Sequence, residues 1–238
     1  MPYRRLPNTD QARLRAVKTA LIKGGDISPV DLAFSQKLLL DLKSFYPHFE
    51  QVLGQYQHNR ERKAHIGKEL NEHFKNARIY FSHFLQVVNM AIARGEIKPE
   101  IREFYGLSKD DRSLPEIGTE QQLLFHGRQL IEGEEDRMAT GAATRIYNPS
   151  LAMVRVKFEK FHEYYNIHKD LLKTATKLLD KVNGYRNTAD KLIINIWNEV
   201  EEYFNDMAPD KKRQKCTEYG VVYVYRPSEK ENCVSNNS

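Results

Sequence analysis

The feature that most constrains the fold of this chain is a long apolar stripe. From Leu151 to Val182, apolar or aromatic residues recur at alternating spacings of three and four positions. On an α-helix this spacing places them all along one face. The same pattern runs from Leu39 to Tyr56. A helix with one apolar stripe must bury it, so the sequence predicts long helices that pack against each other.

A second stripe follows each of these two. It runs from Ala77 to Ala91 in the first part of the chain and from Ala189 to Tyr203 in the second. We interpret each pair of successive stripes as a long helical hairpin, with a turn between its two helices. Two such hairpins together make a four-helix layer around a shared core.

The chain repeats this plan with matching elements. "TDQARLRAVKTALIKGGD" at Thr9 resembles "TEQQLLFHGRQLIEGEED" at Thr119, and each predicts a short helix before a hairpin. Thr119 and Gln122 have the spacing of a capping box. Each half ends in a Tyr-Gly pair, in "EFYGL" and in "TEYGVVYVY". Four elements in the same order predict one domain, 1–238, built from repeats at 9–107 and 119–222.

The second ending differs from the first, because "GVVYVY" is rich in β-branched and aromatic residues. We expect a short strand there, paired with Phe104–Leu107 at the end of the first repeat. The polar tail 231–238 is expected to be disordered. The predicted fold class is therefore mostly α: a pseudo-symmetric four-helix bundle of two long helical hairpins, each preceded by a short helix, plus a short two-stranded β element.

Composition and charge limit the cellular locations and the classes of partner that we expect for this chain. The formal net charge is +5, from 37 basic and 32 acidic residues, which is too small an excess to indicate nucleic-acid binding by itself. The two cysteines, Cys216 and Cys233, do not form a disulfide framework. The N-terminus lacks the apolar core of a signal peptide, and no run approaches 18 apolar residues. We expect a cytoplasmic protein that does not contact a membrane.

No catalytic motif is present, so we expect the protein not to be an enzyme. The sequence has no nucleophile elbow, zinc-protease motif, phosphate loop or dinucleotide fingerprint. Glu159 and His162 form the only Glu-x-x-His pair, whereas a di-iron bundle needs two. Glu69 and His73 lie four apart, but a solvated helix face has the same spacing. No metal or cofactor is predicted.

His168 stands out within the longest stripe, where the first half carries Phe49. A histidine there could bind a ligand or transfer a proton in a bundle pocket. We favour a core residue that hydrogen-bonds a protein group. Tyr46 and Tyr165, which occupy matching positions of the two stripes, are binding candidates of the same kind, although a buried tyrosine commonly has a structural role.

Basic residues form three clusters: Arg4-Arg5, Arg60–Lys63 and Lys211–Lys215. The last contains Lys211, Lys212 and Arg213, in a predicted loop beside the Tyr-rich ending. Basic groups among aromatic residues can bind single-stranded nucleic acid. Acidic residues lie on both sides of this cluster, which favours a solvated loop.

Three segments resemble a family of uncharacterised bacterial proteins: "MPYRRLPNTDQARLRA", "ARIYFSHFLQVVNMAIARGEIKPEIREFYGL" and "EYGVVYVYR". The resemblance runs through most of the chain and implies a complete small protein. It implies no activity, ligand or catalytic residue.

Three functions follow from these observations. The first is a non-enzymatic cytoplasmic helical protein that mediates macromolecular interaction, with another protein or with itself. The second is a nucleic-acid-associated protein that uses the basic loop at Lys211–Lys215. The third is a helical bundle that binds a small molecule or a metal near His168.

Overall fold

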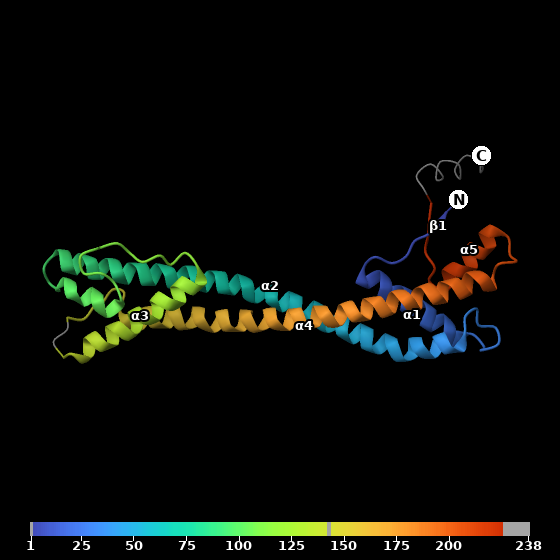
Figure 1. Cartoon of the computed structure of the whole chain (residues 1–238), viewed down its shortest axis with the longest axis horizontal. Helices are drawn as coiled ribbons and strands as arrows, with labels where there is room; N and C mark the ends of the chain where they lie inside the picture. The colour runs from blue at the N-terminus through green and yellow to red at the C-terminus, as the bar shows by residue number, and fades with distance from the viewer. Residues whose placement is uncertain (1, 142–143, 226–238) are drawn as a thin grey trace. The chain divides into compact units, whose positions relative to one another are not determined.

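The structure is a computed structural model that describes residues 2–141 and 144–225. Helices dominate it, and the mostly helical bundle with a short two-stranded sheet, predicted from the sequence, is confirmed (Figure 1). The elements in chain order are β1 (Tyr3–Arg4), α1 (Asp10–Asp26), α2 (Gln36–Ala93), the 3-10 helix η1 (Pro99–Tyr105), α3 (Glu120–Ala139), α4 (Leu151–Tyr203), α5 (Pro209–Glu218) and β2 (Tyr223–Val224).

The two expected hairpins are each one continuous helix, so the predicted turns are wrong. α2 has 58 residues and α4 has 53. The reason is visible in the register of the stripes: Ala77 follows Tyr56 by three whole heptads, and Ala189 follows Val182 by one. Most residues between the first two stripes are good helix formers, the gap between the second two is only six residues long, and no proline separates either pair. Two stripes in one phase therefore belong to one long helix.

The chain forms two compact units, and each contains elements of both predicted repeats. Unit 1 comprises residues 2–58 and 175–225 of the described chain, and unit 2 comprises residues 59–141 and 144–174. Unit 1 thus combines α1 and the start of α2 with the end of α4 and α5. Unit 2 combines α3 and the start of α4 with the end of α2 and η1. The tail 231–238 lies outside the described residues.

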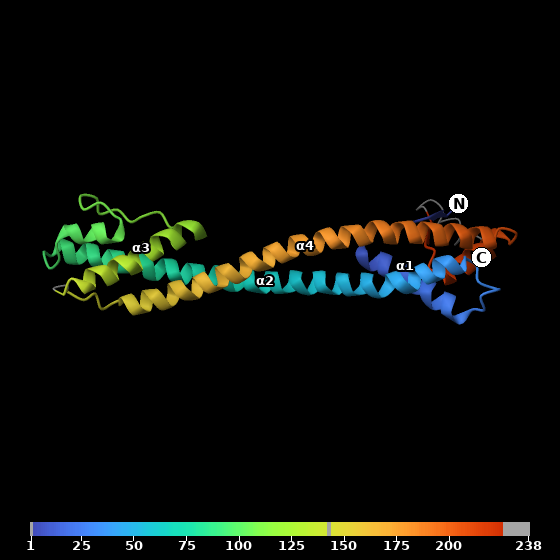
Figure 2. The same ribbon diagram turned by 60° about the horizontal axis from the view of Figure 1, so that its bottom comes forward.

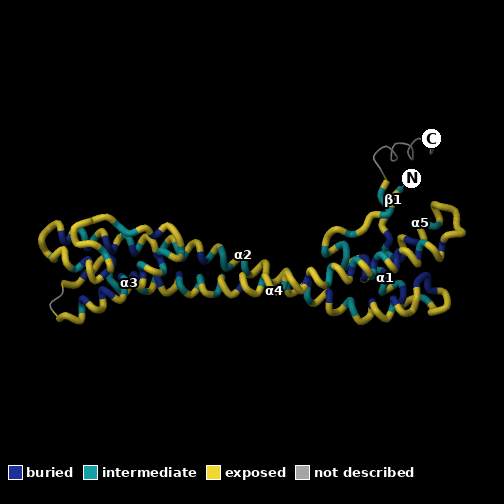
Figure 3. The backbone as a smooth tube through the Cα atoms, viewed as in Figure 1, coloured by how far each residue is buried: buried dark blue, intermediate teal, exposed yellow. Residues whose placement is uncertain are grey.

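Within each unit the segments of α2 and α4 run antiparallel (Figures 1 and 2). In unit 1, Phe49 stacks on Tyr185, and in unit 2, Phe74 packs against Phe161. Buried positions gather where the short helices lie beside the long ones (Figure 3). The largest fully buried side chains include Trp197 in unit 1. Each unit therefore has its own apolar core.

The predicted strand exists, but its predicted partner is wrong. β2 pairs antiparallel with β1, with Tyr3 opposite Val224 and Arg4 opposite Tyr223. The segment around Phe104 instead ends η1, whose turn at Gly106 has a φ of 67°. Because η1 packs on α3 in unit 2 and β2 belongs to unit 1, the two Tyr-Gly endings lie in different units.

Candidate binding pocket

The sheet of unit 1 is fixed to α4 through one carboxylate. Glu201 accepts a hydrogen bond from Arg4 at 2.9 Å and another from the Tyr223 hydroxyl at 2.6 Å. Burial and this bond to Glu201 both raise the pKa of Tyr223. Side chains alternate between the faces of a strand, so Arg5 and Val222 lie on the opposite face from Arg4 and Tyr223.

That opposite face borders a pocket with a closed rim. At the first corner, the amide of Arg5 donates to the Val222 carbonyl at 2.8 Å. At the second, Gly220 approaches α1 so closely that an added Cβ would lie 3.2 Å from the Ala16 carbonyl oxygen. At the third, the N-terminal arm turns into α1 at Thr9, whose hydroxyl caps the helix by accepting from the Ala12 amide. The arm, α1 and the segment around β2 therefore form a three-sided ring.

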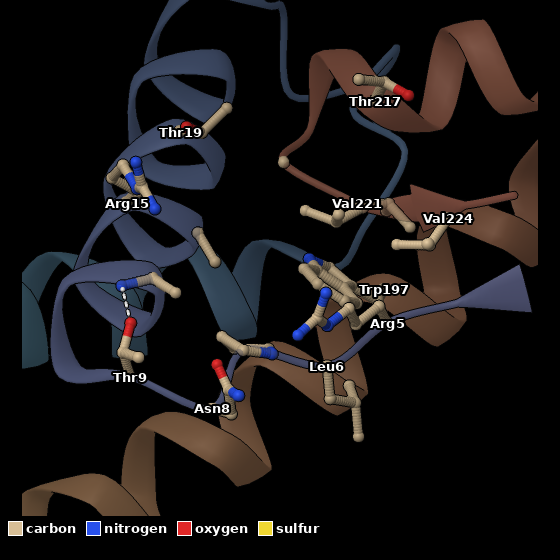
Figure 4. Close-up of a pocket in the computed structure, with 15 residues that line it drawn as sticks. Arg5, Leu6, Asn8, Thr9, Arg15, Thr19, Trp197, Thr217, Val221 and Val224 are labelled. Atoms are coloured by element: carbon tan, nitrogen blue, oxygen red, sulfur yellow. Dashed lines mark hydrogen bonds between the residues drawn. The ribbon is translucent and has the colours of Figure 1, made fainter. Parts of the chain in front are cut away.

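The pocket inside this ring has a volume of about 480 Å³ (Figure 4). Its floor includes Trp197 of α4, which is only 1% exposed. Apolar side chains and a few polar groups make up the walls, which suits a ligand with an apolar body. The lining residues come from several elements that meet at this ring: Arg5, Leu6, Pro7, Asn8, Thr9, Ala12, Arg15, Ala16, Thr19, Trp197, Thr217, Gly220, Val221, Val222 and Val224.

The charged side chains of the pocket are all positive, because its lining includes two arginines and no carboxylate. Arg5 comes from the N-terminal arm and Arg15 from α1 (Figure 4). Both are exposed, and among the described residues neither forms an ion pair. A negatively charged group would therefore be attracted to this opening.

Neighbouring arginines of the same unit are already paired. Arg13 binds Asp190 through two hydrogen bonds of 2.7 and 3.0 Å. Arg186 binds Asp10 in the same two-point manner, at 2.7 and 2.6 Å. The hydrogen bonding from Arg186 lowers the pKa of Asp10. These arginines fix α1 to α4, whereas Arg5 and Arg15 remain available for a ligand.

The corresponding region of unit 2 is filled by larger residues. Thr119 follows Thr9 by 110 positions, and on this alignment Ala12, Ala16 and Thr19 of α1 match Gln122, His126 and Gln129 of α3. Gln129 lies against Gly106, where an added Cβ would meet its amide nitrogen at 2.9 Å. Gly220 of unit 1 meets the smaller Thr19 instead. Small side chains on α1 thus leave a space within unit 1. Larger side chains on α3 fill the equivalent space within unit 2.

The candidate residues predicted from the sequence are not brought together. Tyr46 lies in unit 1, where its hydroxyl donates to Glu50 at 2.6 Å, and burial with this bond raises its pKa to about 12. Tyr165 and His168 lie in unit 2. Tyr165 packs against Phe161 and beneath the Lys169 ammonium. None of the three lines the pocket of unit 1.

His168 is half-buried and does not lie in the core as we expected. Its ring faces Gly67 of α2, where an added Cβ would lie 3.8 Å from Nε2. Within residues 2–141 and 144–225, the structure shows no hydrogen bond from this ring, contrary to the prediction. The reason is that α3 contacts α4 at Phe158 and His162, before His168, so the stripe at His168 is only partly shielded from solvent.

The basic cluster at Lys211–Lys215 is helical, so the predicted loop is wrong. It forms half of α5, which begins at Pro209, a residue favoured in the first helical turn. Lys212 donates to Asn205 at 2.9 Å, and Arg213 pairs with Asp210. Lys211 is exposed. Most of this cluster therefore stabilises its own helix and the turn before it.

The histidine pairs noted above have structural partners. His162 lies 3.3 Å from Arg128 and 3.2 Å from Asn166, and burial lowers its pKa. In the part of the chain that the structure describes, no group of three histidine, cysteine or acidic residues is placed to hold a metal ion. In the same residues, no helix is long and apolar enough to cross a membrane.

Sequence reasoning missed the pocket, although it noted Arg5 in a basic cluster. The weak signal was the pair of arginines in "RRLPNTDQARLRA", since only the fold shows that Arg5 and Arg15 border one cavity. No model of a protein family, no curated protein and no solved structure matches this chain.

Proposed function

We propose that this chain is a non-enzymatic, cytoplasmic protein-binding module whose binding site is the pocket of unit 1. The observation that carries the proposal is the lining itself: an apolar cavity closed by Trp197, bordered by two arginines and by no carboxylate. Buried aromatic residues and arginines are enriched where proteins bind one another most strongly. The ligand that fits is a peptide with an apolar residue next to a negative charge.

Selection from a displayed peptide library with the whole chain as bait tests this proposal. Enriched peptides are synthesised with a fluorescent label, and their affinity is measured by anisotropy. The double variant Arg5→Glu and Arg15→Glu should weaken binding at least about tenfold, because it removes two charge-assisted contacts and adds repulsion.

The matched control is Lys18→Glu with Lys43→Glu, which changes the net charge equally at two exposed positions outside the pocket. This control should bind as the unchanged protein does. Equal losses in both double variants would mean that the peptides respond to overall charge, and the pocket would then not be the binding site.

A nucleic-acid role ranks below this proposal. Three of the basic residues of α5 that would have to contact phosphates are engaged: Lys215 bonds Glu218 at 3.1 Å, and Lys212 and Arg213 have the partners described above. Titration with a labelled single-stranded oligonucleotide over a range of salt concentrations tests it directly. Salt-sensitive binding that Lys211→Ala and Lys212→Ala abolish would favour the nucleic-acid role.

A further inference from the structure

We infer that the occupant of the pocket is the C-terminal end of a partner chain, with its last side chain against the apolar inner wall in front of Trp197 and its α-carboxylate at Arg5 and Arg15. This inference rests on the proposed function, because it names the part of a protein that the pocket receives.

The closed rim admits a chain end and excludes a segment that passes through. A passing segment needs two openings, but each corner of the ring is joined. The Arg5–Val222 hydrogen bond joins the arm to β2, the close approach of Gly220 joins the β2 segment to α1, and the chain itself continues from the arm into α1 at Thr9. Buried Trp197, Ala16 and Val221 line the inner side of the pocket. A ligand therefore enters end-on.

The polarity of the pocket sets which end fits. The floor at Trp197 is buried and apolar, whereas Arg5 and Arg15 are exposed at the opening. An internal Asp or Glu side chain that entered end-on would place its charge near the floor, where desolvation is costly. A C-terminal residue instead places an apolar side chain on the floor and leaves its carboxylate near the rim. Guanidinium groups bind carboxylates with charge-assisted hydrogen bonds.

Other polar groups of the wall match the backbone of such an end. The side chains of Asn8, Thr19 and Thr217 line the pocket. Each can donate or accept hydrogen bonds to the last peptide groups of a bound chain. A positively charged N-terminus has no partner here, since no carboxylate lines the pocket. The chemistry therefore selects a free carboxyl end over an amino end.

Trp197 is the only tryptophan of the chain, so its fluorescence reports occupancy of the floor. The probes are acetylated tetrapeptides Gly-Ser-Gly-X, with X as Ala, Val, Leu or Phe, each made as a free acid and as a C-terminal amide. A further probe, acetyl-Gly-Leu-Glu-Gly-Ser-amide, carries the same chemistry in an internal position. We expect at least one free acid to change Trp197 emission, and its amide to bind at least about tenfold more weakly.

Thr19→Gln supplies the matched variant, because it places in α1 the residue that α3 carries at the corresponding position. It should fill the pocket and abolish the response to the free acid, while thermal unfolding stays close to that of the unchanged protein. Gln129→Thr, the reverse change in unit 2, should leave binding unaltered.

The possible outcomes distinguish the proposed protein-binding function from the inference that the pocket binds a C-terminal chain end. If the amide or the internal peptide binds as well as the free acid, and Arg5→Glu with Arg15→Glu still weakens it, the pocket binds protein segments but the chain-end inference is wrong. If neither these probes nor the displayed peptides bind through the pocket, the proposed function is wrong as well. If Thr19→Gln binds the free acid normally, the ligand does not occupy this cavity.

Discussion

Where α1 carries Gly24 in unit 1, α3 carries Glu134 in unit 2, and both positions are buried. Gly24 lies against Leu39 and Phe34, so this part of unit 1 is apolar. Glu134 instead accepts hydrogen bonds from the Tyr105 hydroxyl at 2.6 Å and from Arg137 at 2.6 and 2.7 Å. Corresponding positions of α1 and α3 therefore have apolar surroundings in unit 1 and an ion pair in unit 2.

The residues three positions before the two Tyr-Gly tyrosines differ in the same way. Cys216 of unit 1 is fully buried, and burial raises the pKa of its thiol. Arg102 of unit 2 is 2% exposed, and it donates to the carbonyl groups of Ser108 at 2.8 Å and Ser113 at 2.9 Å. Its third partner is the side chain of Asn89.

The difference in buried residues corresponds to a difference in the loops that each unit holds in place. Arg102 binds both ends of the segment between Ser108 and Ser113, and Arg137 donates to the Thr144 carbonyl at 2.9 Å after α3. In unit 1 the linker between α1 and α2 is held mainly by apolar residues, including Leu32, Ala33 and Phe34. The comparison suggests that buried charge in unit 2 satisfies loop carbonyl groups that apolar packing would leave unpaired.

The largest expected effect comes from cutting the chain between Lys109 and Asp110, in the connection between η1 and α3. Each unit contains parts of both fragments, so neither fragment can bury its apolar stripes alone. We expect the separate fragments to lack cooperative thermal unfolding and the mixed fragments to regain it. Circular dichroism melts and size-exclusion chromatography measure both. A fragment that melts cooperatively as a monomer would contradict the division into units that share both repeats.

The next largest effect is expected from Glu134→Gln. This change keeps the shape but leaves the Arg137 guanidinium buried without its carboxylate, which typically costs roughly 3–5 kcal/mol. Urea unfolding measures the loss. The control is the double variant Glu134→Met with Arg137→Met, which removes both charges and should recover part of the stability, because the Tyr105 hydroxyl and the Thr144 carbonyl still lose their partners. A loss below about 1 kcal/mol for the single change would show that the ionic interior of unit 2 is not needed.

These two units also show how far the sequence could predict the structure. Periodicity predicted α1, α3 and the helical segments of α2 and α4, but not α5, and the Thr119–Gln122 capping box is present, with Thr119 accepting from the Gln122 amide at 3.2 Å. Strand preference predicted β2, because its residues are β-branched or aromatic. The partner β1 has two residues, which is too short a signal to detect. The sequence could not show that each unit combines segments of both predicted repeats, because local patterns do not specify which distant stripes pack together.

The candidate site was harder to predict for the same reason. Arg5, Arg15 and Trp197 come from the arm, α1 and α4, and no local spacing relates them. His168 attracted attention because it interrupts an apolar stripe, yet a stripe predicts burial only where another element covers it. Glu134 gave no signal either, since a glutamate on an amphipathic helix usually faces solvent.

We expect Gly133→Ala to lower stability less than Glu134→Gln does. This change tests how closely η1 packs on α3. An added Cβ would lie 1.9 Å from the Phe104 carbonyl oxygen, so η1 would have to move away from α3. Such overpacking costs typically about 1–3 kcal/mol. Lys23 occupies the corresponding position of α1, so unit 1 accommodates a long side chain there. Gly54→Ala and Gly184→Ala are controls without a neighbour within 4 Å, and in a helix interior they should raise stability slightly. Equal unfolding midpoints for Gly133→Ala and these controls would contradict the close contact.

The smallest expected effect is a difference between the two Tyr-Gly tyrosines at high pH. Burial raises the pKa of both Tyr105 and Tyr219 above the usual value of 10.0. Glu134 raises that of Tyr105 further, whereas a hydrogen bond with the Ala33 backbone and the nearby Lys23 oppose the rise at Tyr219. A raised pKa means that the folded state holds the proton more tightly, so this stability is present below about pH 10 and is lost as pH rises through the folded values.

Unit 1 should therefore lose its contribution first, because two groups oppose the rise in pKa at Tyr219 whereas Glu134 adds to the rise at Tyr105. Absorbance at 295 nm follows phenolate formation, and Tyr219→Phe should remove an earlier step of the titration than Tyr105→Phe. Repeating the titration in Glu134→Gln sharpens the comparison, since loss of the carboxylate should lower the pKa of Tyr105 and leave that of Tyr219 unchanged. If Tyr105 ionises first in the unchanged protein, the carboxylate of Glu134 does not control its proton, and the electrostatic difference between the units is smaller than their buried residues indicate.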